Sequence, residues 1–267
     1  YFWGLSSSGK TTALAGIFST AYKEGWIELA QSNGYKYMSQ LQTVFNEKTG
    51  MLPRGNTVDE TQYLPFTLKM DKERKSRSIS LIELSGETVE CFYYKMNNKE
   101  LPSVHHTKSF NLLENFLKSD NRKMHFFFVD YESNNEKDDK NKLTQAQYLN
   151  AAAAYFNLPE NNYFKKSTDA IYIVLTKSDL MHGENKIEQL NSYLYNNNYN
   201  SLVQSLKSKC KDYHINGGKL LATHFSLGEV FFKHYCKFNA ETSLNMIDIF
   251  KRRISQSQNS ILNVFNQ

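Results

Sequence analysis

The sequence predicts an α/β fold in which a mostly parallel central sheet is covered by helices on both faces, with one antiparallel hairpin strand. Strand-like and helix-like segments alternate along the chain, as in folds built from strand–helix–strand units. The segments 124–130 and 170–175 are almost wholly apolar, which is typical of strands buried on both faces of a parallel sheet. We therefore expect one three-layer domain with about six main strands over residues 1–254, followed by a polar tail at 255–267.

Composition and charge are those of a globular protein. The chain has 267 residues, of which 40% are hydrophobic and 14% aromatic, which argues against disorder. The net charge of +5 is spread along the sequence, so a solvated surface is favoured over nucleic-acid binding. Cys91, Cys210 and Cys236 show neither metal-ligand spacing nor a paired framework, which suits a cytoplasmic protein. No apolar run reaches the roughly 20 residues of a membrane span, so no transmembrane segment is predicted.

The first part of the chain predicts two helices and a hairpin. Residues 10–31 have a helical pattern, and residues 36–48 carry apolar side chains at helical spacing. Two β-like segments follow at 63–70 and 77–84, joined by the charged turn 71–76. This arrangement predicts an antiparallel hairpin within an otherwise parallel fold.

The later elements follow from the same patterns. Residues 88–95 have a strand-like composition, whereas 109–118 and 143–157 have helical patterns. Buried strands are predicted at 124–130 and 170–175, and the last strand at 219–225. Residues 229–238 and 241–254 are interpreted as terminal helices.

The stretch Gly4-Leu5-Ser6-Ser7-Ser8-Gly9-Lys10-Thr11 matches the phosphate-binding loop (Walker A) pattern, two glycines bracketing four residues and followed by Lys and a hydroxyl residue. The glycines allow a turn whose amide N–H groups point inward at phosphate oxygens. The helix that follows contributes the positive end of its dipole. Lys10 would reach the β- and γ-phosphates, and the Thr11 hydroxyl would bind Mg²⁺. The motif predicts a P-loop NTPase fold whose phosphate cradle comprises Gly4, Ser7, Ser8, Gly9, Lys10, Thr11 and Thr12.

A carboxylate ends the predicted strand at 77–84, where the chain continues as Glu83-Leu84-Ser85-Gly86-Glu87. In a nucleotide-hydrolysing site, an acid at the end of a buried strand holds Mg²⁺, and a glycine amide three residues later bonds the terminal phosphate. The position of this segment after the phosphate loop favours that role over an ordinary strand exit.

A second acid competes for the same role. The apolar strand at 124–129 ends in Asp130, and four apolar residues followed by Asp also describe the magnesium-binding strand of an ATPase. Glu132 would then be the water-activating base. Glu83 and Asp130 therefore remain alternatives for the magnesium-side acid.

A further motif ends the strand at 170–175, which leads into Thr176-Lys177-Ser178-Asp179. A carboxylate at Asp179 can accept hydrogen bonds from both the N1–H and the exocyclic amine of guanine. Adenine lacks this pair of donors, so such a site rejects ATP. With these residues, the chain resembles the Ras-like, translation-factor-related (TRAFAC) class of P-loop GTPases, and in particular a bacterial small-GTPase-like domain.

The resemblance assigns further roles, position by position. Thr57 or Thr61 would be the switch threonine that closes on Mg²⁺ and the γ-phosphate, with Thr57 preferred. Glu83 and Gly86 would form the second switch, so that Thr11, Thr57 and Glu83 are the implied metal ligands. Lys10, Thr57, Glu83, Gly86 and Glu87 are the implied catalytic residues. The base site would consist of Thr176, Lys177, Asp179 and Ser226.

Three positions depart from the family pattern. Glu83 stands where the family has Asp, and Ser226-Leu227-Gly228 replaces the usual Ser-Ala-x. Glu87 occupies the place of a water-positioning Gln, and its charge is repelled by the γ-phosphate. The expected function is therefore binding of GTP and GDP with Mg²⁺, slow hydrolysis, and a nucleotide-dependent switch that acts on a protein effector or complex subunit. The alternatives are an ATPase that uses Asp130 and Glu132, or a nucleotide-binding module without turnover.

Overall fold

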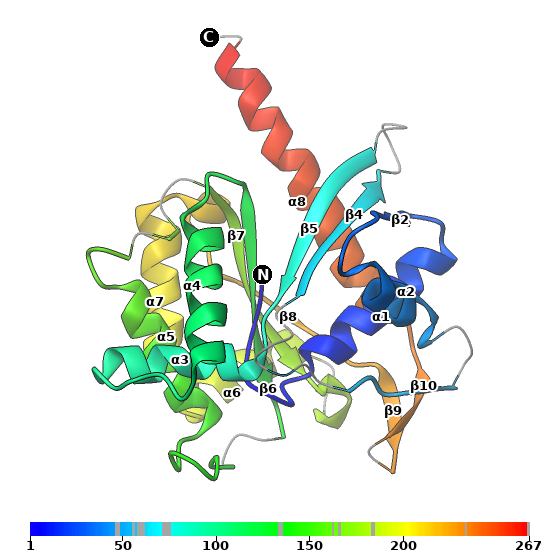
Figure 1. The fold of residues 1–267 in the computed structure, drawn as a ribbon. Coiled ribbons are helices and arrows are strands. Elements are labelled where there is room, and N and C mark those ends of the chain that lie inside the picture. The colour runs from blue at the N-terminus through cyan, green and yellow to red at the C-terminus, as the bar shows by residue number, and fades with distance from the viewer. Residues whose placement is uncertain are drawn as a thin grey trace. The chain divides into compact units, whose positions relative to one another are not determined.

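The fold is described from a computed structural model in which the chain forms two compact units (Figure 1). Unit 1 comprises residues 1–10, 55–61 and 83–224, and unit 2 comprises 11–54, 62–82 and 225–267. The residues that the structure describes are 1–45, 49–54, 57, 62–70, 76–132, 136–161, 163–164, 167–182, 185–232 and 234–265, without the side chains of 49, 62 and 257–265.

Unit 1 is built on a parallel sheet. Its strands β1 (Phe2–Trp3), β6 (Lys123–Asp130), β7 (Thr168–Thr176) and β8 (Leu221–His224) lie in this order and are all parallel. Glu83, the last residue of β5 (Ser76–Glu83), pairs with Phe2 on the other side of β1, again in parallel. Because Asp130 lies opposite Thr176 in the register, the carboxyl ends of β6 and β7 meet at one edge of the sheet.

Helices accompany this sheet, which confirms the predicted α/β class with a mostly parallel sheet. They are α3 (Gly86–Met96), α4 (Val104–Lys118), α5 (Gln145–Phe156), α6 (Lys186–Asn196) and α7 (Asn200–Asp212), together with the short 3₁₀ turns η2 (Ser178–Leu180) and η3 (Ile215–Gly218). Helix α3 packs against α4 and α5, and α5 packs against α7. Polar side chains cap the amino ends of four of these helices by accepting backbone N–H groups, namely Ser85, Ser103, Thr144 and Asn185.

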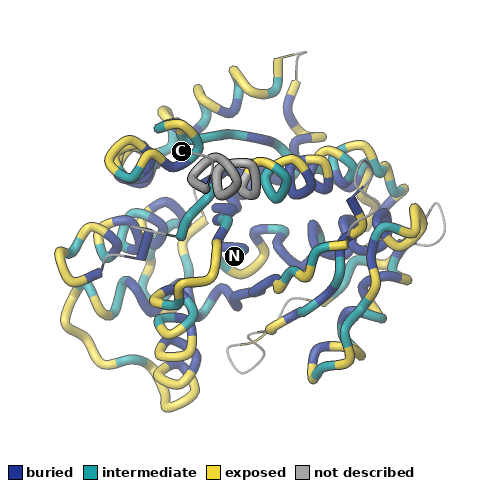
Figure 2. The backbone as a smooth tube through the Cα atoms, turned by 90° about the horizontal axis from the view of Figure 1, so that it is seen from above, coloured by how far each residue is buried: buried dark blue, intermediate teal, exposed yellow. Residues whose placement is uncertain are grey.

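The core of unit 1 is aromatic, and buried positions concentrate on the strands and on one side of each helix (Figure 2). Trp3 is fully buried and stacks on Phe127, with the ring centroids 5.6 Å apart. Its indole Nε1–H donates to Nδ1 of His125 over 3.0 Å. Burial holds the pKa of His125 well below its usual value, so this imidazole is a neutral hydrogen-bond partner within the core.

Unit 2 contains two small groups of strands together with helices. Strand β2 (Ile27–Leu29) pairs antiparallel with β4 (Gln62–Lys69), which neighbours β5. A second sheet has the order β3 (Thr49–Met51), β10 (Tyr235–Phe238) and β9 (Gly228–Phe231), with antiparallel pairing throughout. Its helices are α1 (Lys10–Lys23), whose first residue is the last of the segment 1–10 in unit 1, α2 (Tyr35–Thr43) and α8 (Glu241–Phe265).

Two predicted elements are wrong. Residues 88–95 form most of α3, because Ser85 caps the helix by accepting the N–H of Thr88, and this local bond outweighs the strand-like composition. In the segment predicted as a helix at 229–238, the described residues form the β9–β10 hairpin and no helix. Its turn includes Phe232, whose φ is 51°, and such a conformation interrupts a helical pattern.

Other boundaries shift while the element type is confirmed. The helix predicted for 10–31 ends at Lys23, since Gly25 adopts a left-handed φ of 65° and the chain turns into β2. The helix predicted for 36–48 ends at Thr43, and the one predicted for 241–254 continues to Phe265. The predicted strands at 124–130 and 170–175 lie within β6 and β7. The organisation into one domain with a separate tail stays a prediction.

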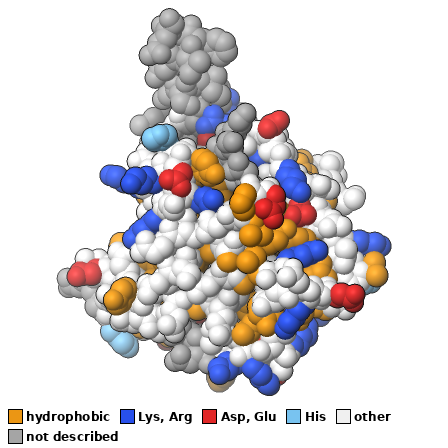
Figure 3. Space-filling model, turned by 90° about the vertical axis from the view of Figure 1, so that its left-hand side faces the viewer, with side chains coloured by type: hydrophobic (Ala, Val, Ile, Leu, Met, Phe, Trp, Pro, Cys, Tyr) orange, Lys and Arg blue, Asp and Glu red, His pale blue; other side chains and the backbone are white. Residues whose placement is uncertain are grey.

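The side of the molecule drawn in Figure 3 has no single strongly charged face among its described residues. On the side drawn in Figure 3, basic and acidic side chains are scattered among uncharged ones, and hydrophobic side chains gather in one part of the view. Among the described helices, none is both long and apolar enough to cross a bilayer.

Candidate functional site

The loop between β1 and α1 has an unusual backbone. Gly4, Ser7 and Gly9 have positive φ values of 155°, 63° and 82°. A Cβ atom at Gly4 would lie 2.5 Å from Ser8 Oγ and 3.0 Å from the carbonyl oxygen of Phe128, so no larger residue fits there without a shift of the loop. The loop therefore wraps closely around the end of β6, and two glycines make this possible.

The side chain of Lys10 folds back over this loop. Its Nζ donates to the carbonyl oxygens of Gly4 and Leu5, both over 2.7 Å, and to Ser8 Oγ over 3.4 Å. Lys10 is buried, and this burial lowers its pKa from 10.5 to about 8, although the charge of Glu83 opposes the shift. The ammonium group thus sits in a desolvated position where an anionic ligand would stabilise its charge.

The amino end of α3 lies directly against the same loop. Gly86 is the first residue of α3, and a Cβ atom built on it would overlap the backbone nitrogen of Ser6 and lie 2.5 Å from the carbonyl carbon of Leu5. Only glycine allows this approach of two backbones. The sequence assigned Gly86 and the loop to one site, and the structure brings them together.

Two carboxylates flank Gly86. Glu83 is fully buried at the end of β5 and lies close enough to Lys10 for its charge to raise the pKa of that residue. Glu87 is half-buried in the first turn of α3, where the helix dipole favours a negative charge. Glu83, Gly86 and Glu87 therefore share one end of the parallel sheet with the loop.

The end of β7 is hydrogen-bonded to the same loop. The hydroxyl Oγ1 of Thr176 lies 3.0 Å from the carbonyl oxygen of Ser8 and 3.3 Å from that of Val129. A Cβ atom at Gly9 would meet the Thr176 side chain at 3.2 to 3.4 Å. A buried hydrogen bond between residues 168 positions apart in sequence thus joins the loop to the tetrapeptide that begins at Thr176.

Lys177 forms an ion-pair cluster with two carboxylates. Its backbone adopts a left-handed φ of 55°, and its Nζ lies 2.9 Å from Asp130 Oδ2 and 2.8 Å from Glu132 Oε2. Asp130 Oδ1 in turn accepts the backbone N–H of Glu132 over 2.9 Å. Burial alone would lower the pKa of Lys177, but the hydrogen bonds that its Nζ donates to Glu132 and Asp130 raise it above its ordinary value.

The sequence motifs did not indicate the residues that hold Asp130. Its backbone N–H donates to Gln145 Oε1 over 3.0 Å, and its carbonyl oxygen accepts the Tyr193 hydroxyl over 2.9 Å. Gln145 opens α5 and Tyr193 lies in α6, so these contacts arise only when the helices pack at the end of β6. No short-range pattern in the sequence signals either residue.

Asp179 lies in the turn η2, directly after Lys177, and its side chain is exposed. The preceding Ser178 is buried, and its Oγ lies 3.0 Å from Nδ1 of His224 at the end of β8. This contact ties the turn that carries Asp179 to the last strand of the parallel sheet.

The other predicted residues are four threonines and Ser226. Thr11 is buried and Thr12 half-buried in the first turn of α1, Thr57 is exposed, and Thr61 lies outside the described residues. Ser226 belongs to unit 2, where its backbone N–H donates to Thr242 Oγ1 over 3.2 Å and its Oγ accepts the N–H of Gly228 over 2.9 Å. Within the described part of the chain, no group of three or more His, Cys, Asp or Glu side chains is arranged to hold a metal ion.

Comparison with known proteins adds no relative. No protein-family model matches the chain, and the curated proteins include no significant match. Any function must therefore be inferred from the residues and geometry described above.

Proposed function

We propose that this chain binds GTP and GDP together with Mg²⁺, hydrolyses GTP slowly, and reports its nucleotide state to a protein partner. The observation that carries the proposal is the hydrogen bond from Thr176 to the carbonyl oxygen of Ser8. It joins a loop suited to phosphate and a tetrapeptide suited to guanine within one unit, as a single nucleotide requires.

The phosphate half of the proposal rests on the loop and Lys10. Positive φ values at Ser7 and Gly9 allow successive backbone N–H groups to turn toward one concave side, which favours anions. Lys10 is a buried cation whose pKa is lowered by desolvation, and a phosphate group would compensate its charge better than backbone carbonyls do.

The base half rests on Asp179. An exposed carboxylate in the η2 turn can accept two hydrogen bonds from guanine, whereas adenine would leave it unpaired. The two ion pairs of Lys177 and the Ser178–His224 contact hold the two residues that precede Asp179, so that the carboxylate is presented from a fixed backbone.

The donor types fit Mg²⁺, which prefers oxygen ligands and binds through one or two carboxylates together with phosphates. Glu83 would supply the carboxylate, and Thr11 and Thr57 the hydroxyls. When bound, the ion would neutralise charge on the phosphates. Glu83 lies near Lys10, so its carboxylate is close to the expected phosphate position.

Slow turnover follows from Glu87. A carboxylate in the first turn of α3, next to Gly86 and the loop, is repelled by a γ-phosphate and is poorly suited to orient the attacking water. A partner protein that supplies a neutral group would relieve this limit, which is consistent with a switch.

The ATPase alternative requires Asp130 to bind Mg²⁺ and Glu132 to activate water. Both carboxylates lie within 3 Å of Lys177 Nζ, an arrangement that suits structural support of the base loop better than metal binding. We therefore place Asp130 and Glu132 in the support of the base loop.

Nucleotide competition tests the base assignment. A labelled GTP analogue bound to the purified chain should be displaced by GTP and GDP but not by equal concentrations of ATP. The Asp179→Asn substitution should change the preferred ligand from guanine to xanthine nucleotides. An Asn amide can donate to the C2 carbonyl of xanthine, where guanine has an amine. Displacement by ATP as effective as by GTP would overturn the proposal.

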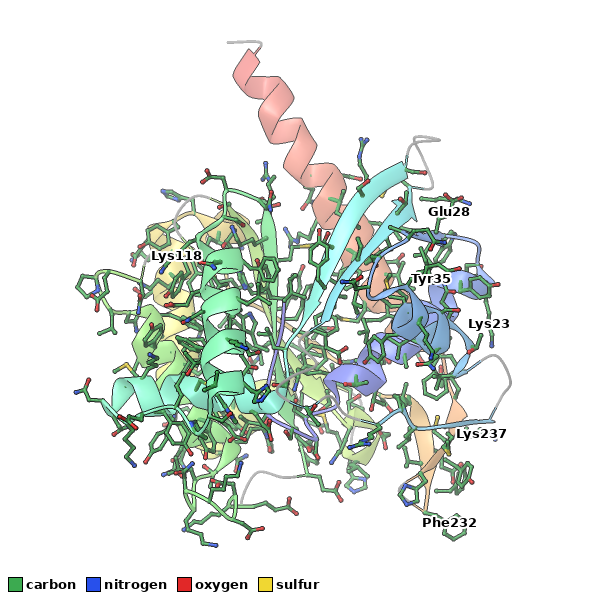
Figure 4. All side chains as sticks on the ribbon, viewed as in Figure 1. Lys23, Glu28, Tyr35, Lys118, Phe232 and Lys237 are labelled. Carbon is green, nitrogen blue, oxygen red and sulfur yellow. The ribbon has the colours of Figure 1, made fainter. Side chains whose placement is uncertain are left out.

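Phosphate release tests turnover. The Lys10→Ala variant should lose Mg²⁺-dependent release of phosphate from GTP, whereas Lys118→Ala should retain it. Lys118 is a matched control because it is an exposed lysine in α4, 3.9 Å from Glu114 (Figure 4). If wild type and Lys10→Ala release phosphate equally slowly while only wild type binds GTP, the chain is a nucleotide-binding module without turnover.

A further inference from the structure

One face of the three-stranded sheet in unit 2 carries a row of exposed apolar side chains. Met51, Tyr235 and Phe231 are direct cross-strand partners, so their side chains lie on the same face. Their exposed fractions are 65%, 49% and 39%. On the opposite face the middle strand β10 is packed, since Cys236 is fully buried and Phe238 stacks on Phe45 with ring centroids 4.6 Å apart, whereas Val230 of the edge strand β9 is 45% exposed.

The turn of the β9–β10 hairpin extends this row. Phe232 is 86% exposed, the largest exposed fraction among the large hydrophobic side chains that the structure describes, and it lies at the end of the hairpin away from the sheet (Figure 4). Lys237 alternates with Tyr235 along β10 and therefore shares the exposed face, where the exposed Glu229 of β9 is its direct cross-strand partner. In sequence, Lys233 and His234 follow Phe232 directly.

The net charge of the chain resides in the same unit. Unit 2 contains fourteen Lys and Arg against eight Asp and Glu, a formal charge of +6. Unit 1 contains eighteen against nineteen, a formal charge of −1, and the two values account for the total of +5. An anionic surface would therefore attract unit 2 and not unit 1.

We propose that this surface, defined by Met51, Phe231, Phe232, Tyr235 and Lys237, docks onto an anionic lipid bilayer. Aromatic rings favour the level of the lipid headgroups, and neighbouring lysines favour anionic lipids. A stable protein partner would need about 20–30 residues on each side, far more than this row and turn provide. A few apolar side chains with adjacent cations are enough for reversible membrane contact.

Docking would be peripheral. Phe232 enters the boundary between headgroups and acyl chains, with Met51, Tyr235 and Phe231 beside it, while Lys237 stays at the level of the lipid phosphates. Because the apolar contact and the charge act together, binding should need both an intact Phe232 and anionic lipid, and should weaken as salt increases.

Vesicle co-sedimentation of the full chain tests this inference. Vesicles of phosphatidylcholine with phosphatidylserine should bind the chain at low salt, and pure phosphatidylcholine vesicles should bind it much less. Phe232→Ser should lower the partition coefficient roughly tenfold, the contribution of one large apolar side chain. Lys237→Glu should lower it by a similar factor. Tyr195→Ser is the matched control, because Tyr195 is a 73%-exposed aromatic residue on α6 of unit 1.

Circular dichroism establishes that each variant is folded. Equal binding to neutral and anionic vesicles, no binding to either, or equal loss in Tyr195→Ser would overturn the inference. Light scattering adds a further outcome: a wild-type dimer that Phe232→Ser converts to a monomer would assign the surface to a second copy of the chain instead. The assay contains no nucleotide, so its result is independent of the proposed GTP site.

Discussion

Substitution of Gly86 by Ala tests the contact between α3 and the loop. The added Cβ would overlap the nitrogen of Ser6 and lie 2.5 Å from the carbonyl carbon of Leu5, whereas carbon atoms pack favourably at about 3.5–4.0 Å. One backbone must therefore move by roughly 1 Å. Since both neighbouring atoms belong to the backbone, we expect a loss of about 3 kcal/mol, the upper end for an overpacked core.

The sign of the stability change in Gly86→Ala separates the steric clash from the intrinsic helix propensity. Gly86 occupies the first position of α3, and helix propensity alone would make Ala more stable than Gly by up to about 1 kcal/mol. Urea denaturation measures the free energy of unfolding, and fluorescence titration of a labelled GTP analogue should show an affinity loss of about 100-fold, as expected for a misplaced binding group.

Gly217→Ala provides the control within the same unit. Gly217 has a φ of 64°, and no atom lies within 4 Å of the position that an added methyl group would occupy. Ala there should therefore cost about 1–2 kcal/mol of backbone strain and leave nucleotide affinity unchanged. A Gly86→Ala variant that is as stable as wild type and binds GTP equally well would refute the close approach of α3 to the loop.

Three further substitutions probe the charges and hydrogen bonds of the site. The pKa of Lys10 falls from 10.5 to about 8 on folding, so between these pH values the unfolded chain holds a proton that the folded chain lacks. The free energy of unfolding of wild type should therefore rise with pH relative to Lys10→Met, by roughly 3 kcal/mol across this window, and a pH-independent difference in urea titrations would contradict the buried ammonium. Lys177→Met leaves the buried Asp130 carboxylate without this cation and should lower the free energy of unfolding by about 3 kcal/mol. Adding Asp130→Asn to this variant should restore part of the lost stability. A double variant that is no more stable than Lys177→Met would count against the ion pair. Thr176→Val removes the hydroxyl that bonds Ser8 and should cost about 1 kcal/mol in thermal unfolding, together with weaker nucleotide binding; unchanged affinity would show that the loop and the base strand act separately.

The sequence predicted the buried parallel strands and the loop correctly, whereas the element types predicted for 88–95 and 229–238 were wrong. Strands β6 and β7 are recognisable because their continuous apolar runs, 126–129 and 170–175, have few other places in a folded chain. The segment 88–95 was misinterpreted because aromatic and β-branched residues suit both a strand and the buried face of a helix. The cap at Ser85, which decides between them, is a local feature that the sequence contains.

The candidate site likewise contains residues that can be recognised from the sequence and residues that cannot. Gly4, Gly9 and Lys10 were recognisable from their spacing, because a phosphate-binding loop is local and needs consecutive backbone groups. The partners of Lys177 could not be recognised from the sequence, because they lie at the end of a neighbouring strand, more than forty positions earlier in the chain. Asp130 was therefore considered as a metal ligand when its nearest described cation is Lys177.

By itself, the sequence determined the features that depend on neighbouring residues: the glycines and lysine of the loop, the apolar strands, and the acids at the ends of β5 and β6. Only the tertiary structure decided which strand ends meet, that Thr176 bonds the loop, that Gly86 touches Ser6, and that Phe232 and its neighbours face outward. The reason is physical. Spacing along the chain controls backbone conformation, whereas pairing of side chains far apart in sequence follows from the order and register of the sheet.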